Sequence, residues 1–122
     1  MPDAKPLALI IEDDPGSAEA LALILRDWGA DVAQGVSSDG IGAALGPRAG
    51  DLRWIITDFH LSAGPDGVTL VQSLARSAPQ ARVLVLSGSF HGRATAAAAD
   101  AGFEVMQKPA RAEAIVAWLE RA

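Results

Sequence analysis

The chain has 122 residues, half of them hydrophobic and a fifth charged, with a mean hydropathy of +0.23. This length suits one domain with a single core, because domains commonly have about 100–150 residues. The formal net charge of −5, without a lysine or arginine cluster along the sequence, argues against direct binding of nucleic acid or an anionic membrane. The sequence has no cysteine, no apolar run of about 18–20 residues and no cleavage-site pattern near its start, so we expect a cytoplasmic protein.

The first strand and the first helix have clear signals. Leu7–Ile11 is a continuous apolar run, as expected for a strand that is buried on both faces of a parallel sheet. A helix is predicted to follow, with Asp14 as its N-cap, Pro15 in its first position and Gly29 at its end. Its apolar face is predicted from residues at helical spacing: Leu21, Ile24, Leu25 and Trp28.

The same alternation of strand and helix continues along the chain. Further strands are predicted at Asp31–Gln34, Trp54–Thr57, Arg82–Leu86 and Glu104–Gln107, and further helices at Asp39–Leu45, Gly67–Ser77, Arg93–Ala101 and Ala110–Arg121. Five strand–helix units with short connections favour an α/β fold with a parallel sheet, right-handed crossovers and helices on both faces. Such sheets bind ligands at the carboxyl ends of their strands.

Charged and polar residues follow four of the predicted strands. They are, in chain order, Glu12–Asp14, Asp58, Ser87 and Lys108. Clustered carboxylates repel one another, and magnesium, which is often held by one or two carboxylates together with a phosphate, is the natural compensating ion. We expect Asp13 and Asp58 to supply the carboxylates, with Lys108 and the Ser87 hydroxyl meeting the other oxygens of a phosphoryl group.

Five short motifs stand in order at successive strand ends. They are IIEDD at Ile10–Asp14, IITDFHL at Ile55–Leu61, PDG at Pro65–Gly67, VLSGS at Val85–Ser89 and QKPA at Gln107–Ala110. Together they resemble the receiver domains of two-component response regulators over essentially the whole chain. The resemblance implies a flavodoxin-like (βα)5 fold, doubly wound, with a five-stranded parallel sheet in the order 2-1-3-4-5. It also implies that residues 1–122 form a single receiver domain without an output domain.

The resemblance implies a role for each carboxylate. Asp58 is the phosphoryl acceptor, which receives its phosphoryl group from a histidine kinase or a histidine phosphotransfer protein and becomes an acyl phosphate. Asp13 and Asp58 bind Mg2+ directly, Glu12 binds it through a water molecule, and His60 contributes its backbone carbonyl. Asp14 is then a helix cap and not a ligand.

The resemblance also implies which residues contact the phosphoryl group and respond to it. Ser87 matches the switch serine or threonine, Lys108 matches the lysine that contacts the phosphoryl group, and Lys108–Pro109 matches the family's usual cis peptide. Phosphorylation is expected to draw Ser87 inward and bias protein contacts between two arrangements. The downstream partner is expected on the Arg93–Ala101 helix, the last strand and the last helix. The protein is expected to be a monomer or weak dimer that catalyses only its own phosphorylation and dephosphorylation.

Three features depart from the usual receiver pattern. The Asp58–Gly67 loop is one residue longer than the common spacing and has Ser62 in place of the usual proline, as in receivers of hybrid histidine kinases and some stand-alone receivers. Val105 stands where many receivers have an aromatic residue that rotates inward as the switch serine or threonine moves, so we expect no such rotation here. His60 and Ser89 match the two positions at which receivers tune the lifetime of the acyl phosphate.

Other functions stay open beside the receiver interpretation. The chain starts with Met1 and stops after the last predicted helix, which favours a stand-alone regulator over a receiver fragment of a hybrid histidine kinase. A constitutive pseudo-receiver and a small magnesium-dependent phosphatase are the remaining alternatives. A metal pair of His60 and His91 is disfavoured because two histidines without further ligands rarely suffice. Trp118 is predicted either to pack in the core or to mark a partner surface.

Overall fold

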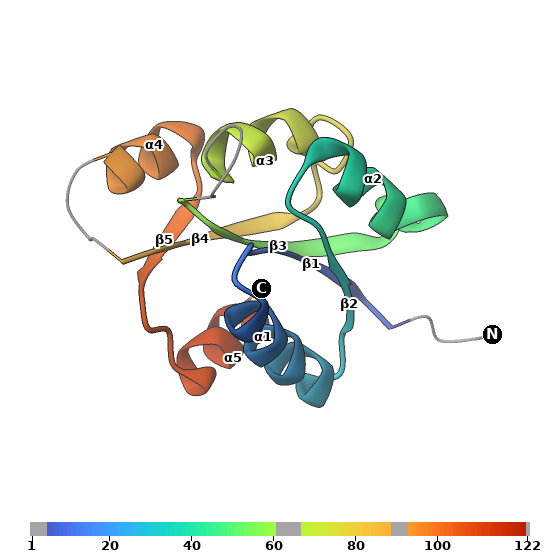
Figure 1. The fold of residues 1–122 in the computed structure, drawn as a ribbon, viewed down its shortest axis with the longest axis horizontal. Helices are drawn as coiled ribbons and strands as arrows, with labels where there is room; N and C mark the ends of the chain where they lie inside the picture. Colours follow the sequence, from blue (N-terminus) through green and yellow to red (C-terminus); the bar gives the residue numbers. More distant parts are fainter. Residues whose placement is uncertain (1–4, 61–66, 89–92, 122) are drawn as a thin grey trace.

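Five parallel strands form one sheet in the order β2-β1-β3-β4-β5 (Figure 1). This computed structural model describes residues 5–60, 67–88 and 93–121 of the chain. The strands are β1 (Leu7–Ile11), β2 (Asp31–Gln34), β3 (Leu52–Asp58), β4 (Arg82–Ser87) and β5 (Glu104–Gln107). The helices are α1 (Pro15–Trp28), α2 (Ser38–Leu45), the 3-10 helix η1 (Gly46–Asp51), α3 (Gly67–Ala75), α4 (Arg93–Ala101) and α5 (Ala112–Glu120). The predicted α/β fold and strand order are confirmed.

The helices cover both faces of the sheet, with α1 and α5 on one face and α2, α3 and α4 on the other (Figure 1). The residues of β1 are all buried and alternate between two cores. Leu7, Leu9 and Ile11 pack in the core beneath α2, α3 and α4. Ala8 and Ile10 pack in the core beneath α1 and α5. Because side chains of a strand point to opposite faces in turn, a continuous apolar run can fill both cores.

The capping residues of α1 are those that the sequence predicts. The Asp14 carboxylate accepts a hydrogen bond of 2.9 Å from the backbone N–H of Ser17, which satisfies one of the unpaired donors at the helix start. This bond lowers the pKa of Asp14. Gly29 follows Trp28 with φ +122°, a backbone conformation that other residues rarely adopt.

Two tryptophan predictions have different outcomes. The ring of Trp28, which was predicted on the apolar face of α1, lies edge-on to that of Trp54 on β3 at the border of the core, with centroids 5.3 Å apart. Trp118 on α5 is only 1% exposed and its indole N–H donates to Glu104 Oε1 at 2.8 Å. The interpretation of Trp118 as a partner surface is therefore wrong, because packing and a hydrogen bond use the whole side chain.

Several element ends differ from the predicted ones. Asp58 and Ser87 are the last residues of β3 and β4 and do not follow them, since both still pair within the sheet. The 3-10 helix Gly46–Asp51 was not predicted; there Arg48 bonds to Asp31, to Asp51 and to the Lys5 carbonyl. Asp31 and Lys5 are distant from Arg48 in the sequence, so these two contacts could not be predicted from a local pattern.

Gly67 ties the start of α3 to the end of β3. Its backbone N–H donates to the Phe59 carbonyl at 2.9 Å, and a Cβ there would lie 2.1 Å from the Asp58 carbonyl oxygen. Only glycine permits this approach, which sets the backbone around Asp58. Most of the longer loop that the sequence predicts after Asp58, together with Ser89 and His91, lies outside the described residues.

None of the helices in the described ranges has the length and apolar character that crossing a membrane requires.

Candidate functional site

Three carboxylates meet at the edge of the sheet where the strands end. β1 and β3 are neighbours paired with Ile11 beside Thr57, so the residues that follow Ile11 come to lie beside Asp58. Carboxylate oxygens of Glu12, Asp13 and Asp58 all lie within 4.8 Å of one another. The predicted convergence of these three residues is therefore present in the structure.

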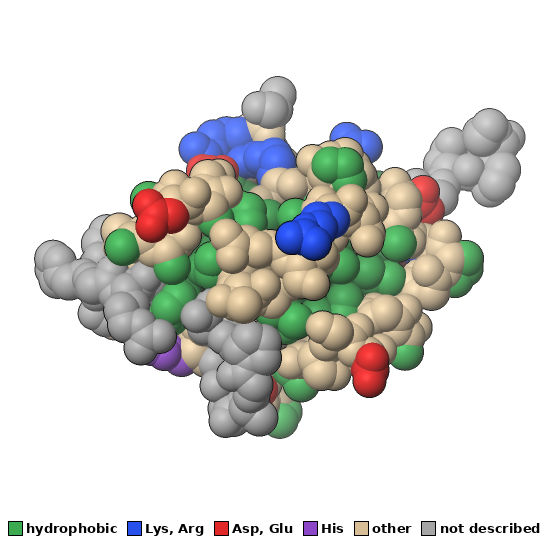
Figure 2. All heavy atoms as spheres, turned by 90° about the horizontal axis from the view of Figure 1, so that it is seen from above, with side chains coloured by type: hydrophobic (Ala, Val, Ile, Leu, Met, Phe, Trp, Pro, Cys, Tyr) green, Lys and Arg blue, Asp and Glu red, His purple; other side chains and the backbone are tan. Residues whose placement is uncertain are grey.

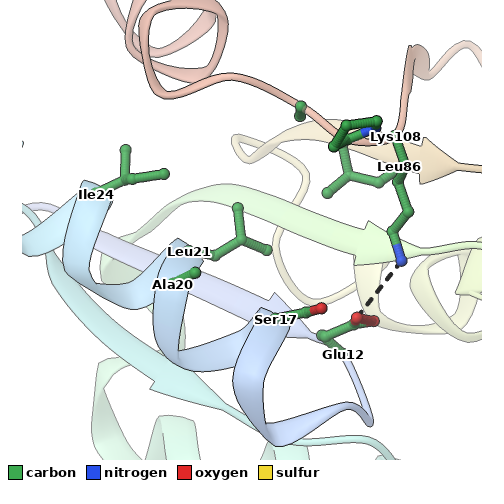
Figure 3. Close-up of a pocket in the computed structure, with 9 residues that line it drawn as sticks. Glu12, Ser17, Ala20, Leu21, Ile24, Leu86 and Lys108 are labelled. Carbon is green, nitrogen blue, oxygen red and sulfur yellow. Dashed lines mark hydrogen bonds and ion pairs between the residues drawn. The ribbon is translucent and has the colours of Figure 1, made fainter.

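Lys108, which directly follows β5, approaches two of these carboxylates. Its Nζ lies 3.3 Å from Asp58 Oδ2 and 3.5 Å from Glu12 Oε1, and Figure 3 shows the side chain extended toward Glu12. The backbone N–H of Lys108 donates to the Ser87 carbonyl at 2.8 Å. The peptide bond between Lys108 and Pro109 is cis, as the resemblance implied.

The electrostatics of the cluster are dominated by burial of Glu12. The Glu12 side chain is only 3% exposed. Burial and the neighbouring Asp58 raise the pKa of Glu12 from 4.5 to about 7, although Lys108 opposes the shift. Burial disfavours the charged form of Lys108, but Asp58 and Glu12 outweigh it and the pKa of Lys108 is raised. The cluster thus holds more negative charge than one lysine neutralises.

A divalent cation suits this cluster on two observations. Glu12 Oε2 is buried and has no hydrogen-bond partner among the described residues. An unpaired buried carboxylate oxygen is costly, and a cation or a water bound to it would remove the cost. Three carboxylates form a hard oxygen-donor set of the kind that Mg2+ prefers.

Ser87 and His60 flank the cluster in different environments. Ser87 is fully buried as the last residue of β4, one position beyond the partner of Asp58 in the sheet register. His60 is exposed, and its ring lies edge-on to that of Phe59 with centroids 4.8 Å apart.

Sequence reasoning missed Thr57, whose buried hydroxyl donates to the backbone carbonyl of Asp58 at 3.0 Å. A hydroxyl in an otherwise apolar strand, just before the acid, was the available signal.

An apolar groove of about 440 Å3 lies beside Glu12 and Lys108. One wall is the face of α1 with Ala20, Leu21 and Ile24, and the other is the connection after β5 (Figure 3). Apolar surface therefore adjoins the charged cluster.

The fold and the site together define a class: a doubly wound α/β protein with a cluster of acidic side chains at the carboxyl edge of its sheet. The family model for the response regulator receiver domain matches residues 8–120. The chain belongs to this family. Receiver domains of the family are regulatory and interact with histidine kinases and with downstream partners.

Individual relatives agree with this assignment. The chain is 31% identical over 118 residues to the nitrogen assimilation regulatory protein NtrX of Azorhizobium caulinodans, covering 93% of this chain and 25% of that protein. It therefore spans about a quarter of the length of this relative.

Two solved structures illustrate the fold. A response regulator from Burkholderia pseudomallei has a TM-score of 0.78 and 31% identity, covering 93% of this chain and 66% of that chain; it was crystallised with a phosphorylated aspartic acid, a calcium ion and citrate. The chemotaxis protein CheY4 of Vibrio cholerae has a TM-score of 0.81 at 17% identity, covering 97% of this chain and 98% of that chain.

Proposed function

We propose that this protein is a phosphorelay receiver in which Asp58 accepts a phosphoryl group from a phosphohistidine of a histidine kinase or phosphotransfer protein. The observation that carries the proposal is the contact of Lys108 Nζ with Asp58 Oδ2 at 3.3 Å, beside the carboxylates of Glu12 and Asp13. A carboxylate nucleophile with an adjacent fixed cation suits attack on a phosphoryl group, since the cation stabilises the charge on its oxygens.

The proposed transfer is a displacement at phosphorus. An Asp58 carboxylate oxygen forms the new P–O bond while the P–N bond to the donor imidazole breaks. The imidazole, which carries a proton on its other nitrogen, takes the electron pair of that bond and leaves as neutral histidine. Positioning does most of the work in such loose transition states, and Lys108 is held for it by its backbone bond to Ser87.

Mg2+ would be held by Asp13, Asp58, the backbone carbonyl of His60 and, through a water molecule, Glu12. When bound, the ion would neutralise part of the charge of the incoming phosphoryl group. The orphaned Oε2 of Glu12 supports this assignment. The protein's own contribution is to keep the carboxylates within 4.8 Å of one another before any donor arrives.

The groove between α1 and the connection after β5 is the proposed contact for the donor protein. It opens beside Glu12 and Lys108, and Ala20, Leu21 and Ile24 of α1 give it an apolar wall. A donor helix with apolar side chains could cover this surface while presenting its phosphohistidine to Asp58. The burial gained there would favour productive orientation.

The proposed output surface comprises α4, β5 and α5. Ser87 lies at the end of β4, next to β5, and Val105 of β5 packs against the same core as Ala97 and Ala101 of α4. A shift of the Ser87 hydroxyl toward a phosphoryl group would be passed on through this packing, without an aromatic side chain at position 105.

The proposal is tested by incubating the protein with acetyl phosphate, with and without Mg2+, and measuring its intact mass. The expected result is one magnesium-dependent phosphoryl adduct that is absent from Asp58→Asn. Beryllofluoride, a phosphoryl mimic, should bind the unmodified protein and not the variant. Absence of both the adduct and beryllofluoride binding would reject the acceptor role. Full signalling by Asp58→Asn in its native pathway would instead support a constitutive pseudo-receiver.

A further inference from the structure

Basic side chains gather at the edge of the sheet where the strands begin, opposite the carboxylate cluster. Two adjoining cavities of about 480 and 560 Å3 lie along this edge and share Pro6, Arg53 and Gln80 in their walls. We call the combined cavity the N-edge groove. Its charged lining consists of four cations and two anions: Lys5, Arg53, Arg82, Arg121, Asp51 and Glu120. Figure 2 shows basic side chains collected along one edge of the molecule, at the top of the picture.

The excess of positive charge is notable because the whole chain has a formal net charge of −5. Asp51 pairs with Arg48 at 3.3 Å, whereas Glu120 accepts the neutral indole N–H of Trp28 at 3.2 Å and keeps its charge, so the lining still has more cations than acids. The groove is therefore a local positive region on an acidic protein, suited to a negatively charged ligand.

The four cations divide into two that are used by the fold and two that are not. Arg82 donates to the Trp118 and Arg121 carbonyls at 2.8 Å each and pairs with Glu104 at 3.1 Å, and Arg121 also pairs with Glu104. Arg53 and Lys5, by contrast, have exposed side chains without an ion-pair partner among the described residues. These two supply the charge that a ligand could use.

We propose that the N-edge groove binds an acidic peptide segment of a partner protein. The two available cations lie along the groove: Lys5 lines only the smaller cavity, whereas Arg53 lines both. The larger cavity continues past Arg53 to the half-buried ring of Trp28. This order suits an extended chain that places carboxylates on Lys5 and Arg53 and an apolar side chain against Trp28 and Pro6.

A nucleotide suits the same lining less well. Phosphate groups need several uncommitted cations or backbone N–H groups directed at one point. Arg82 and Arg121, which do converge, are directed at Glu104 instead. The available charge is thus spread along the groove and not focused in it.

Such binding is compatible with phosphorylation. Arg53 and Asp58 lie on the same strand β3, five residues apart, which corresponds to about 16 Å at ~3.3 Å per residue. The N-edge groove is also separate from the apolar groove beside Lys108, whose lining contains none of its residues. A partner could therefore remain bound while Asp58 exchanges its phosphoryl group.

The experiment is an NMR titration of the 15N-labelled full chain with a pool of synthetic peptides, each about twelve residues long. Asp or Glu alternates with Phe, Leu, Ile and Trp in the pool, and a second pool has Asn and Gln in place of the acids. The acidic pool is expected to shift the Trp28 indole N–H and the backbone amide of Arg53, whereas the backbone amide of Lys108, which is bonded to the Ser87 carbonyl at the opposite edge of the sheet, stays unchanged. The neutral pool is expected to shift neither.

Arg53→Glu is the decisive variant and Arg76→Glu, an exposed arginine after α3, is its matched control. Arg53→Glu should weaken binding about tenfold, since an attractive contact becomes repulsive, and Arg76→Glu should not. Arg53→Gln serves the same purpose if the glutamate variant does not fold. The proposal is overturned if the acidic pool leaves Trp28 and Arg53 unshifted or if the shifts survive both Arg53 variants. It is also overturned if ATP moves these signals while the peptides do not, because the groove would then be a nucleotide site.

Discussion

Replacement of Glu12 by glutamine should stabilise the metal-free protein above neutral pH. The Glu12 carboxyl has a pKa of about 7 in the folded protein against 4.5 in the unfolded chain. Between these values the folded state binds more protons than the unfolded state, so the free energy of unfolding decreases as pH rises. Above about pH 7 the folded carboxylate is charged, buried and close to Asp58, and the whole penalty is present.

The size of the effect follows from the shift. At 1.36 kcal/mol per pKa unit, a rise from 4.5 to about 7 corresponds to roughly 3 kcal/mol. Because glutamine is neutral at every pH, Glu12→Gln should have a free energy of unfolding about 2–3 kcal/mol higher at pH 8. The difference should nearly disappear at pH 4, where the carboxyl is protonated in the folded protein and mostly protonated in the unfolded chain.

Urea unfolding in a metal chelator, followed by tryptophan fluorescence between pH 4 and pH 8.5, measures this difference. Glu19→Gln, an exposed position on α1, is the control and should change stability at neither pH. Added Mg2+ should reduce the advantage of Glu12→Gln, because the ion stabilises only the carboxylate form. A variant that is no more stable than the original protein at pH 8 would refute the account of Glu12 burial.

Three substitutions outside the carboxylate cluster test the packing and the hydrogen bonds of the fold. Gly67→Ala should lower the free energy of unfolding in urea by about 2–4 kcal/mol, because the new Cβ would lie 2.1 Å from the Asp58 carbonyl oxygen unless the backbone moves. A loss below about 0.5 kcal/mol, the size of a neutral surface change, would contradict this. Arg82→Met should lower the free energy of unfolding by about 1–3 kcal/mol, measured by calorimetry, because two carbonyls at the end of α5 and the Glu104 carboxylate lose their donor. An unchanged melting temperature would contradict this expectation. Ser37→Ala removes the hydroxyl that caps α2 through the Gly40 N–H at 3.0 Å, and should cost about 1 kcal/mol, whereas Ser37→Asp should restore most of it.

Local patterns in the sequence were sufficient to predict most of the fold. Leu7–Ile11 is uniformly apolar because the strand is buried on both faces, and the cap residues Asp14 and Gly29 mark the ends of α1 by their own chemistry. The alternation of such segments predicted a parallel sheet, and the order of five motifs indicated the family. Acids and a lysine at strand ends predicted that one edge of the sheet would be charged.

Features that depend on pairing between distant segments needed the structure. The convergence of these side chains was predicted, but the distances between Glu12, Asp58 and Lys108 depend on the registers of β1 with β3, β3 with β4 and β4 with β5, which no local pattern encodes. The raised pKa of Glu12 arises from burial, which the position after a strand does not reveal. Trp118 was ambiguous for the same reason, because only its neighbours on β4 and β5 show that it is in the core.

The N-edge groove is the clearest example of a property decided by the tertiary structure. Lys5, Arg53, Arg82 and Arg121 are too far apart in the sequence to form a basic cluster, and the composition alone indicated an acidic protein. Parallel strands all begin at the same edge of the sheet, which gathers Lys5, Arg53 and Arg82 there, and Arg121 joins them because α5 ends beside this edge. The sequence by itself determined which segments become strands and helices, since that choice depends on local apolar spacing and caps. The tertiary structure decided which charges become neighbours, because electrostatic interactions depend on distance in space.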